Sequence, residues 1–263
     1  MKYGFIGCGN MGGAIARSLA KSTKDIMLTD LSDKAALLAA ELGCTHSDNL
    51  TVCQECDRIF LAVKPQNLEA ALKPLQPILR EKKPLLISMA AGMEVERVQS
   101  FVGCPLPIVR IMPNTPVAVG SGLILYCCND LVDPAVLQDL LADAAPCGTW
   151  TPIAEQLVDA AGVVSGCGPA YMYMFMDALA KGAAACGVPE ETALAYAAET
   201  MIGAARMVLT TGRSPEDLKN AVCSPGGSTI AGVRALESAG FADGILQCVQ
   251  AAYLRNQELG KLK

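Results

Sequence analysis

Short apolar runs alternate with amphipathic stretches over the first half of the chain. Five of these runs predict strands, at residues 2–6, 26–29, 59–63, 85–88 and 107–111. Between them, residues 12–21 and 34–42 have the apolar spacing of helices, and the second has Ser32 as its expected N-cap and Gly43 as its expected C-cap. Residues 122–150 are less regular and are expected to add edge strands and one helix. The alternation is typical of βαβ units on a parallel sheet.

The pattern changes after about Ile153, where strand-like alternation stops. Alanine, leucine, methionine and glutamate then recur at helical spacing in three long segments, near residues 170–186, 189–211 and 241–260. The sequence therefore predicts an α/β protein of two domains: a doubly wound parallel sheet at residues 1–153 and an all-helical domain at residues 154–263. Small residues on more than one helix face permit close packing, which favours an intertwined oligomer over an ordinary monomeric bundle.

Composition excludes several classes of protein. Hydrophobic residues make up 52% of the chain and charged residues 18%, which is incompatible with intrinsic disorder. The 21 basic residues face 26 acidic ones without a long basic run, so we expect no nucleic-acid partner. The longest uncharged run, residues 160–176, is too short and too broken to span a bilayer, so no membrane partner is expected. The 12 cysteines and the strand directly after Met1 favour a reducing cytoplasm over secretion.

Metal and triad chemistry has few candidate residues. His46 is the single histidine and lies in a polar stretch, so it is interpreted as a surface residue rather than a catalytic one. Cys53 and Cys56 form a CxxC pair, but no second pair or histidine accompanies them. We therefore expect no metal site.

Gly7–Gly12 has the spacing GxGxxG directly after the first predicted strand and at the start of the first predicted helix. Gly7 is expected to allow the tight turn, Gly9 to let a pyrophosphate approach the backbone, and Gly12 to let helix and strand pack closely. The free N–H groups and the dipole of the helix would face the phosphates. In this context the motif predicts a Rossmann dinucleotide-binding domain.

Two charged residues at the ends of predicted strands bear on the cofactor. An acidic side chain at Asp30, after the second strand, would accept hydrogen bonds from ribose hydroxyls and repel a 2′-phosphate, which favours NADH over NADPH. If Asp30 turns away from the cofactor, Lys24 or Lys34 could contact a 2′-phosphate. The other alternative is that Asp30 only caps a helix and has no role in cofactor choice. Lys64 follows the strand at 59–63, at the edge of the sheet where ligands bind. It is expected either to contact the ribose or the substrate, or to be an ordinary solvated lysine.

Two clusters of glycine and proline interrupt the helical half, at residues 165–171 and 224–229, and each is expected to begin a helix. In the second, Ser224 is the expected N-cap and Pro225 the first helical residue. This would leave unpaired the N–H groups of Gly226, Gly227, Ser228 and Thr229. Two glycines and two hydroxyls in this position predict an anion cradle suited to a carboxylate, with an ordinary capped helix as the alternative.

Blocks along nearly the whole chain resemble the pyrroline-5-carboxylate reductase family in order and spacing. Besides Gly7–Gly12 they are residues 62–65, 88–92, 112–116, 165–171 and 222–236, and the last block resembles the family's signature. The resemblance implies reduction of 1-pyrroline-5-carboxylate to L-proline, the last step of proline synthesis, by hydride transfer from NADPH or NADH. It also implies a homodimer formed by interlocking helical domains, often within a ring of dimers.

The resemblance places ligand contacts on particular residues. The cofactor set, including the glycine turn, is Gly7, Cys8, Gly9, Asn10, Met11, Gly12, Asp30, Asn49, Ala62, Val63, Lys64, Pro65 and Ala90. The substrate set is Glu155, Val222, Ser224, Gly226, Gly227, Ser228 and Thr229, with the carboxylate held at residues 227–229 and this helix supplied by the partner subunit. Our hypothesis for the catalytic pair is that Thr229 Oγ and Glu155 hold the ring-nitrogen end of the substrate.

The chain departs from the family pattern at four positions. Many members have Ser, Thr, Asn or Arg near the ribose selector and favour NADPH, whereas this chain has Asp30. Cys167 and Cys223 stand where serine is common, which removes a strong hydrogen-bonding hydroxyl at each place. Ala221 stands where some members have an asparagine near the cofactor.

Imine reduction needs a hydride at carbon and a proton at nitrogen, and a protonated iminium is already electrophilic. No strong general base is needed, which agrees with the absence of a positioned histidine. The runner-up class, β-hydroxyacid dehydrogenases, removes an alcohol proton with a lysine in a GxxxKxxxN pattern, but here Gly168 is followed by Met172. A redox regulator using Cys53 and Cys56 is the non-enzymatic alternative, and it leaves the anion cradle unexplained.

Overall fold

The computed structural model describes residues 1–261, with side chains up to residue 258, and its contacts divide the chain into two compact units. Unit 1 comprises Met1–Cys167 and the chain from Ala252 onward, and unit 2 comprises Gly168–Ala251. Unit 1 therefore extends beyond residue 153, where the sequence predicts that the first domain ends. The predicted domain boundary between residues 153 and 154 stays a prediction.

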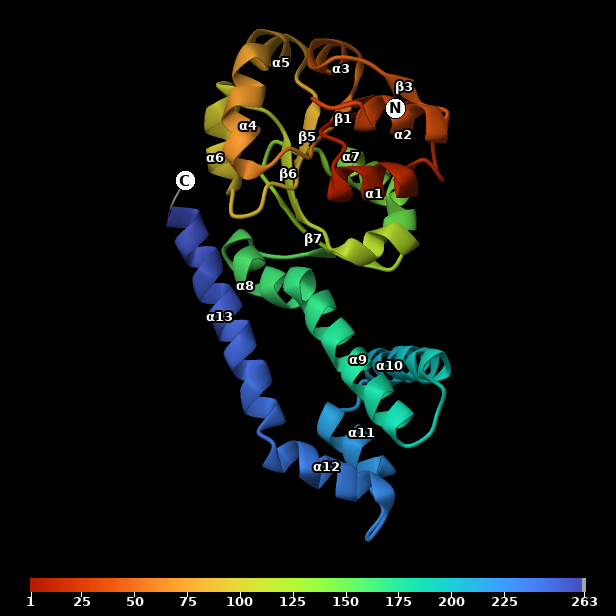
Figure 1. The fold of residues 1–263 in the computed structure, drawn as a ribbon. Coiled ribbons are helices and arrows are strands. Elements are labelled where there is room, and N and C mark those ends of the chain that lie inside the picture. Colours follow the sequence, from red (N-terminus) through yellow and green to blue (C-terminus); the bar gives the residue numbers. More distant parts are fainter. Residues whose placement is uncertain (262–263) are drawn as a thin grey trace. The chain divides into compact units, whose positions relative to one another are not determined.

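Unit 1 is built on a sheet that has eight strands among residues 1–261, in the order β3-β2-β1-β4-β5-β6-β7-β8 (Figure 1). Their bounds are β1 Tyr3–Ile6, β2 Ile26–Thr29, β3 Thr45–His46, β4 Arg58–Leu61, β5 Leu85–Ser88, β6 Ile108–Met112, β7 Gly122–Cys128 and β8 Gly148–Pro152. The strands from β3 to β6 pair in parallel, β7 is antiparallel to β6, and β8 is parallel to β7. The doubly wound sheet and all five predicted strands are confirmed. The strand order reverses between β1 and β4, which is where such sheets bind ligands.

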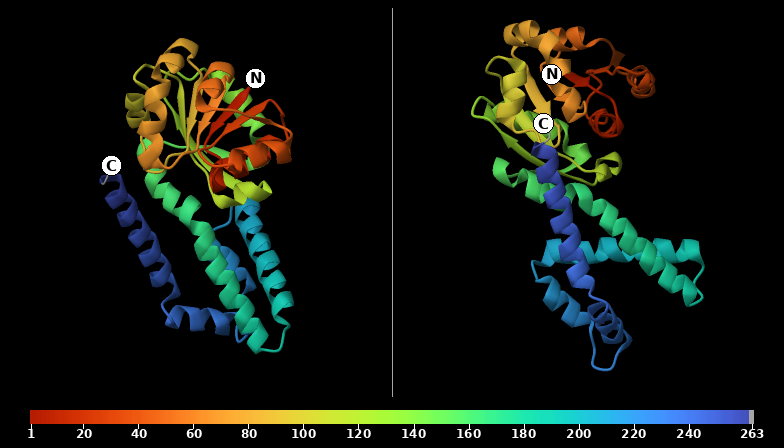
Figure 2. Two further views of the ribbon diagram at one scale, coloured as in Figure 1. Left: turned by 45° about the horizontal axis from the view of Figure 1, so that its top comes forward. Right: turned by 60° about the vertical axis from the view of Figure 1, so that its left-hand side comes forward.

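Helices cover both faces of this sheet (Figures 1 and 2). One face carries α1 (Asn10–Leu19), α2 (Lys34–Leu42) and α7 (Pro134–Asp143), and the other carries α3 (Asn49–Glu55), α4 (Pro65–Leu72), α5 (Gln76–Lys82) and α6 (Val95–Val102). Each face has its own buried cluster: Phe5, Ile15 and Leu140 belong to the first, and Leu61 and Leu68 to the second. Short 3-10 turns, η1 (Lys73–Leu75), η2 (Thr115–Val119), η3 (Ala145–Cys147) and η4 (Glu155–Leu157), complete the connections.

The chain leaves the sheet through a continuous helical segment, so α9 begins within the predicted cluster 165–171 but without the expected break before it. Helix α8 (Val158–Gly162) continues through a π-helical turn, Val163–Cys167, into α9 (Gly168–Ala185). Pro169 has no N–H to offer the carbonyl of Ser165, four residues earlier. The buried side chain of Asn114 donates to that carbonyl at 2.9 Å and accepts from the N–H of Leu123 at 2.9 Å. This tertiary contact lets the helix pass the proline.

Unit 2 is helical, as the sequence predicts. It contains α9, α10 (Glu190–Thr211), α11 (Pro215–Val222), α12 (Ser228–Ser238) and the first part of α13 (Phe241–Lys261). Helices α9 and α10 pack side by side through Ala180, Ala193 and Ala197, small residues that allow close approach (Figure 2). No helix within residues 1–261 is long and apolar enough to cross a membrane.

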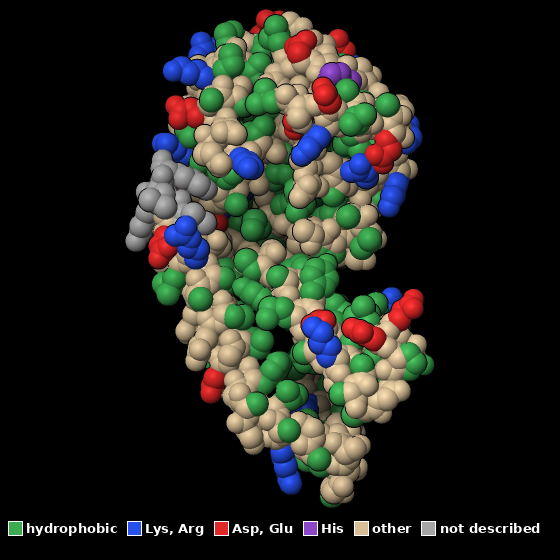
Figure 3. All heavy atoms as spheres, viewed as in Figure 1, with side chains coloured by type: hydrophobic (Ala, Val, Ile, Leu, Met, Phe, Trp, Pro, Cys, Tyr) green, Lys and Arg blue, Asp and Glu red, His purple; other side chains and the backbone are tan. Residues whose placement is uncertain are grey.

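Unit 2 has almost no core of its own. Among its described residues, the buried hydrophobic ones are the same three alanines. Large apolar side chains are instead exposed, including Met174, Tyr196, Leu209, Phe241 and Leu246, and hydrophobic atoms gather over these helices in Figure 3. So many large apolar side chains exposed on one unit indicate a protein interface.

Candidate functional site

The turn after β1 has the geometry that its glycines predict. Gly7 has φ +102°, and a Cβ there would lie 2.7 Å from the Ala62 carbonyl carbon. A Cβ on Gly12 would lie 2.5 Å from the carbonyl oxygen of Gly7, so both positions need glycine. A Cβ on Gly9 would meet nothing within 4 Å, so the backbone is open on that side. The turn and packing roles are therefore confirmed, and Gly9 leaves room for a phosphate.

Helix α1 begins at Asn10 with Gly9 as its N-cap, and no side chain caps it. The N–H groups of the first helical turn have no intrahelical acceptors, and the positive end of the dipole lies there. The N–H of Cys8 is not available in the same way, because it donates to Asp30 Oδ2 at 2.7 Å. Anion donors at this turn thus come from the residues after Cys8.

Asp30 is fixed by hydrogen bonds on both carboxylate oxygens. Oδ2 accepts from Cys8, and Oδ1 accepts from the N–H and the hydroxyl of Ser32 at 2.9 and 2.8 Å. Burial alone raises the pKa of Asp30, but these hydrogen bonds lower it by more, so the net pKa lies below its usual value. Ser32 is thus engaged with Asp30, and the N-cap of α2 is Asp33, which corrects the expected cap. Asp30 is a carboxylate at neutral pH.

A cavity of about 620 Å³ opens beside this turn, at the carboxyl edge of β1, β2 and β4. Seven residues of the predicted cofactor set line it: Gly7, Gly9, Asp30, Asn49, Ala62, Val63 and Lys64. Asn49 begins α3 and accepts a hydrogen bond from the Thr29 hydroxyl at 3.1 Å. Lys64 is the N-cap of α4, and Pro65 is its first residue. The volume suits a small-molecule or cofactor site.

The other six predicted cofactor residues do not line this cavity. Cys8 and Asn10 line a neighbouring cavity of about 280 Å³ with Arg17 and Lys34. Pro65 begins α4, Met11 and Gly12 belong to the first turn of α1, and Ala90 is buried after β5. Their proposed contacts with a cofactor stay predictions.

Sequence reasoning missed one wall of the cavity. Asn67, Ala70, Ala71 and Pro74 line it from α4 and η1, at the spacing of a single helix face. That periodicity was available in the sequence as a signal. Leu31 also lines the cavity and is fully exposed, although it is a large apolar residue directly after Asp30. These apolar groups make a surface on which a flat ring can lie.

The predicted anion cradle lies in unit 2 and differs from its expected form. Helix α12 begins at Ser228 with Gly227 as N-cap, so Ser224 is not the cap and Pro225 is not the first helical residue. Residues 224–227 instead form a turn in which Gly227 N–H donates to Ser224 O at 3.0 Å and Gly226 has φ +72°. The N–H of Gly227 is therefore used, and the donors at the start of α12 are those of Ser228 and Thr229. Val222 ends α11 and is exposed.

Glu155 belongs to unit 1 and has structural partners there. Its Oε1 accepts from the N–H of Val95, at the start of α6, at 2.7 Å, and lies 3.3 Å from the guanidinium of Arg110. Arg110 is buried in β6 and also pairs with Asp159 at 2.6 Å. Glu155 thus belongs to an ion network around the buried Arg110, and its predicted role at the ring nitrogen stays a prediction, as does that of Thr229.

The single histidine and the CxxC pair lie in settings typical of surface and structural residues rather than of catalytic ones. His46 is exposed at the end of the short strand β3. Cys53 and Cys56 are buried, and burial raises the pKa of each thiol to about 12, which makes them poor nucleophiles. No group of metal-ligating side chains occurs in the part of the chain that the structure describes.

A doubly wound sheet with a glycine turn and a cavity at its switch point defines a dinucleotide-binding protein. Family models match the two halves separately: residues 155–259 match pyrroline-5-carboxylate reductase dimerisation, and residues 2–92 match NADP oxidoreductase coenzyme F420-dependent. The pyrroline-5-carboxylate reductase of Escherichia coli is 37% identical over 99% of this chain and 98% of its own length. That of Synechocystis is 40% identical over 81% and 79%.

A solved structure is similar over the same length. The pyrroline carboxylate reductase of Plasmodium falciparum, with NADP bound, matches with a TM-score of 0.89 at 31% identity, over 99% of this chain and 98% of that one. The chain belongs to the pyrroline-5-carboxylate reductase family. The resemblance in the sequence blocks is thereby confirmed, and the helical half contains the dimerisation domain of this family.

Proposed function

We propose that the protein reduces 1-pyrroline-5-carboxylate to L-proline, with hydride from NADH or NADPH. The observation that carries the proposal is the 37% identity to the Escherichia coli reductase along 99% of the chain. The aligned region includes both the residues of the dinucleotide cavity and those of the predicted anion cradle at the start of α12. A redox regulator would need reactive thiols, whereas Cys53 and Cys56 are buried with raised pKa values.

The residues at the carboxyl edge of the sheet fit a dinucleotide. Gly9 is open, the first turn of α1 offers N–H donors to a pyrophosphate, and Leu31 with the α4 face offers an apolar surface to the adenine. The bound cofactor would supply the hydride to the imine carbon. Lys64 lines the cavity and would contact the ribose or the substrate. The chain therefore provides binding and orientation, which is the protein's share of such chemistry.

Residues at the start of α12 would hold the substrate. The N–H groups of Ser228 and Thr229 and their hydroxyls are suited to the carboxylate, and both side chains are exposed. Thr229 Oγ would then lie on the side of the ring nitrogen, with Glu155 as the second candidate. Because a protonated iminium needs no general base, positioning of the ring is the main contribution expected of these residues.

Asp30 favours NADH as the better cofactor, although the Plasmodium relative was solved with NADP. Its carboxylate faces the cavity and would accept hydrogen bonds from ribose hydroxyls, while a 2′-phosphate would meet its negative charge. Lys24 is engaged, because it donates to the carbonyl of Leu42 at 3.2 Å. Lys34 is the nearby cation that could offset the repulsion.

A homodimer formed by unit 2 follows from its lack of a core. A bundle whose buried hydrophobic residues are three alanines needs a second surface over its exposed apolar side chains. An apolar cavity of about 730 Å³ between α9 and residues 236–248 is one place where a second copy would fit. Each substrate site would then take its α12 from the partner subunit. A ring of such dimers is the further assembly we propose.

The test is cofactor oxidation by the purified protein with 1-pyrroline-5-carboxylate, using NADH and NADPH at matched concentrations. Turnover with the imine, and a higher kcat/KM with NADH, is the expected result. A β-hydroxy acid with NAD is the control substrate for the runner-up class, and it should give no turnover. Absence of imine turnover with both cofactors would overturn the proposal.

A further inference from the structure

One buried arginine links several segments near the carboxyl edge of the sheet. Arg110 lies in β6 with its side chain 4% exposed, between Ser88, the last residue of β5, and Cys127 of β7. Its guanidinium pairs with Asp159 at 2.6 Å and with Glu155 at 3.3 Å. Glu155 lies in η4 and Asp159 in α8, which form the segment by which the chain leaves the sheet. Arg110 therefore ties the sheet to this segment within unit 1.

The same network reaches the start of α6 through Glu155. Its Oε1 accepts a hydrogen bond from the N–H of Val95, the first residue of α6, at 2.7 Å. Glu94 is the N-cap of this helix, but its side chain makes no capping bond, so the helix start receives a carboxylate acceptor from 60 positions away along the chain. A carboxylate there also interacts favourably with the helix dipole. Glu155 therefore fixes the point at which the chain enters α6.

The segment that enters α6 lies at the edge of the sheet where ligands bind. Residues 89–94 follow the carboxyl end of β5 and contain Ala90, a predicted cofactor residue, and Gly92, whose φ is +67°. A dinucleotide in a doubly wound sheet lies outside the carboxyl ends of strands on both sides of the switch point. The cofactor cavity borders β1, β2 and β4. We therefore expect the nicotinamide end at the loops that follow β5 and β6.

Arg110 is the fixed member of this network. Its side chain is packed inside unit 1, whereas the side chains of Glu155 and Asp159 are 34% and 48% exposed. A partly exposed carboxylate without a partner samples several rotamers, and a buried cation restricts it to one. Within residues 1–258, no other cation pairs with either carboxylate. The orientation of Glu155 thus depends on Arg110.

We propose that Arg110 is a positioning residue for the reduction and acts through Glu155. The inference rests on the proposed function, in which Glu155 is a candidate for the ring-nitrogen end of the substrate. Oε1 of Glu155 is committed to Val95 and Arg110, while Oε2 makes no hydrogen bond with any residue that the structure describes and is the oxygen left for the substrate. Arg110 thereby aligns the imine and the nicotinamide loop with each other, which is the geometry that hydride transfer needs.

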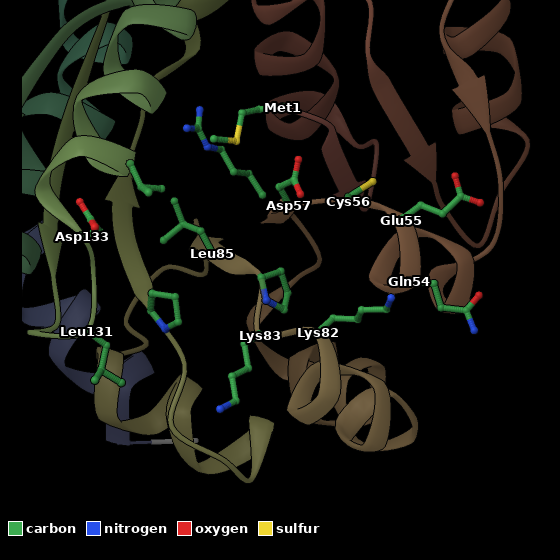
Figure 4. A pocket seen from close by; sticks show the side chains of 14 residues that line it. Met1, Gln54, Glu55, Cys56, Asp57, Lys82, Lys83, Leu85, Leu131 and Asp133 are labelled. Atoms are coloured by element: carbon green, nitrogen blue, oxygen red, sulfur yellow. The ribbon is translucent and has the colours of Figure 1, made fainter.

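The test uses Arg110→Lys, which keeps a cation but loses the fork that spans two carboxylates. Arg58→Lys is the matched control, because Arg58 is also a buried arginine with two carboxylate partners. Arg58 lies at the amino end of β4, where it lines a separate cavity together with Asp57 and Leu85 (Figure 4). The control therefore alters an equivalent ion network at the opposite edge of the same sheet.

Two measurements separate positioning from general damage. In Arg110→Lys, the single-turnover rate of cofactor oxidation with 1-pyrroline-5-carboxylate should fall about tenfold or more. The Kd for ADP-ribose, which lacks the nicotinamide, should stay within about twofold of the native value and shows that the variant is folded. Arg58→Lys should change neither quantity by more than about twofold. An equal fall in rate in both variants, or loss of ADP-ribose binding in Arg110→Lys, would overturn the inference.

A double-mutant cycle tests the route through Glu155. Glu155→Gln keeps an acceptor for the N–H of Val95, and Asp159 still pairs with the guanidinium, so the buried charge keeps a partner. Arg110→Lys should slow the reaction about tenfold in the native background and less than about twofold in the Glu155→Gln background. Equal factors in the two backgrounds would refute this route.

Hydrogen exchange gives a readout that needs no turnover. The N–H of Val95 should exchange about threefold faster or more in Arg110→Lys, and at the native rate in Arg58→Lys. Unchanged exchange in Arg110→Lys would refute the link to α6. Imine turnover by the native chain that Arg110→Lys leaves unaffected would refute this inference alone, whereas absence of imine turnover by the native chain would refute the proposed function together with it.

Discussion

Replacing Asp30 by asparagine separates the charge of this side chain from its shape. In the native chain its two oxygens accept from Cys8 and Ser32 at 2.7 to 2.9 Å. An asparagine can keep the Cys8 bond through its carbonyl oxygen and donate from its amide to the Ser32 hydroxyl, and it loses only the bond from the exposed N–H of Ser32. The turn between β2 and α2 is therefore expected to keep its conformation while the negative charge at the cavity is lost.

This loss of charge is expected to change the cofactor preference by more than tenfold. Two unit charges about 4 Å apart repel by about 1 kcal/mol in water, and a phosphate monoester carries about −1.5 to −2. A partly exposed carboxylate next to a 2′-phosphate therefore costs about 1.5 to 2 kcal/mol, which is about 10- to 30-fold in kcat/KM. NADH has no such phosphate, and in the variant it loses a charge-assisted hydrogen bond to its ribose. Both effects move the preference toward NADPH.

The assay is the ratio of kcat/KM for NADPH to that for NADH, with 1-pyrroline-5-carboxylate as substrate. Asp33→Asn is the matched control, because Asp33 is exposed, makes no side-chain capping bond and does not line the cavity. We expect the ratio to rise in Asp30→Asn and to stay unchanged in Asp33→Asn. A ratio within about twofold of the native one in Asp30→Asn, or an equal rise in both variants, would refute the reasoning.

Thr229→Ala is expected to lower kcat/KM about tenfold or more, as the loss of about 1.4 kcal/mol would, whereas Thr229→Ser should keep most activity; unchanged kinetics in Thr229→Ala would remove this hydroxyl from the site. Asn114→Ala removes two hydrogen bonds of unit 1 and should lower the free energy of unfolding by about 2 kcal/mol, measured in urea by the fluorescence of the single tryptophan; a loss below about 0.5 kcal/mol would contradict the role given to it. The pKa of Asp30 is lower in the folded state, so the folded state binds fewer protons than the unfolded state. The stability gained in this way is present above the pKa of the unfolded state and is lost as the pH falls through the pKa of the folded state. Between pH 6 and pH 3 the native chain should therefore lose more stability than Asp30→Asn, and parallel curves would count against this. Iodoacetamide at pH 8 should leave Cys53 and Cys56 unmodified in the folded protein, because a thiol with a pKa of about 12 has about a thousandfold less thiolate than an ordinary thiol. Mass spectrometry measures the alkylation, and rapid modification of either cysteine would revive the redox alternative.

The carboxyl edge of the sheet is the part of the molecule that sequence reasoning predicts best. Gly7 and Gly12 are each required by a close contact within the turn or with the neighbouring strand, so their residue type carries the information, whereas Gly9 leaves the backbone open. The strands are equally readable, since parallel strands buried on both faces appear as short apolar runs. Asp30 is predicted as a selector, and its bonds from Ser32 are local, but its bond from Cys8 depends on how two loops meet. That meeting is tertiary and leaves no local signal.

The errors have the same origin. Residues 165–169 contain glycine and proline, which predicts a break, yet the side chain of Asn114 from a distant loop supports a continuous helix. The proline at 225 resembles a first helical residue, but the positive φ of Gly226 closes a turn before α12 begins. In both cases one local rule competes with another, and only a contact or a dihedral angle decides between them. The α4 wall was missed because its four residues are unremarkable individually and informative only as a helix face.

The two units differ in how they can be stable, and this bears on where the substrate cradle acquires its geometry. Unit 1 buries a separate apolar cluster on each face of its sheet, whereas the described part of unit 2 buries three alanines. A helical unit with so little buried surface cannot offset its conformational entropy by itself. We expect its stability to come from association through the dimerisation domain, and the start of α12 is part of that same unit. The donors of Ser228 and Thr229 are thus expected to be rigid only in the assembled protein, which couples substrate binding to assembly, while the dinucleotide cavity is formed within a single chain.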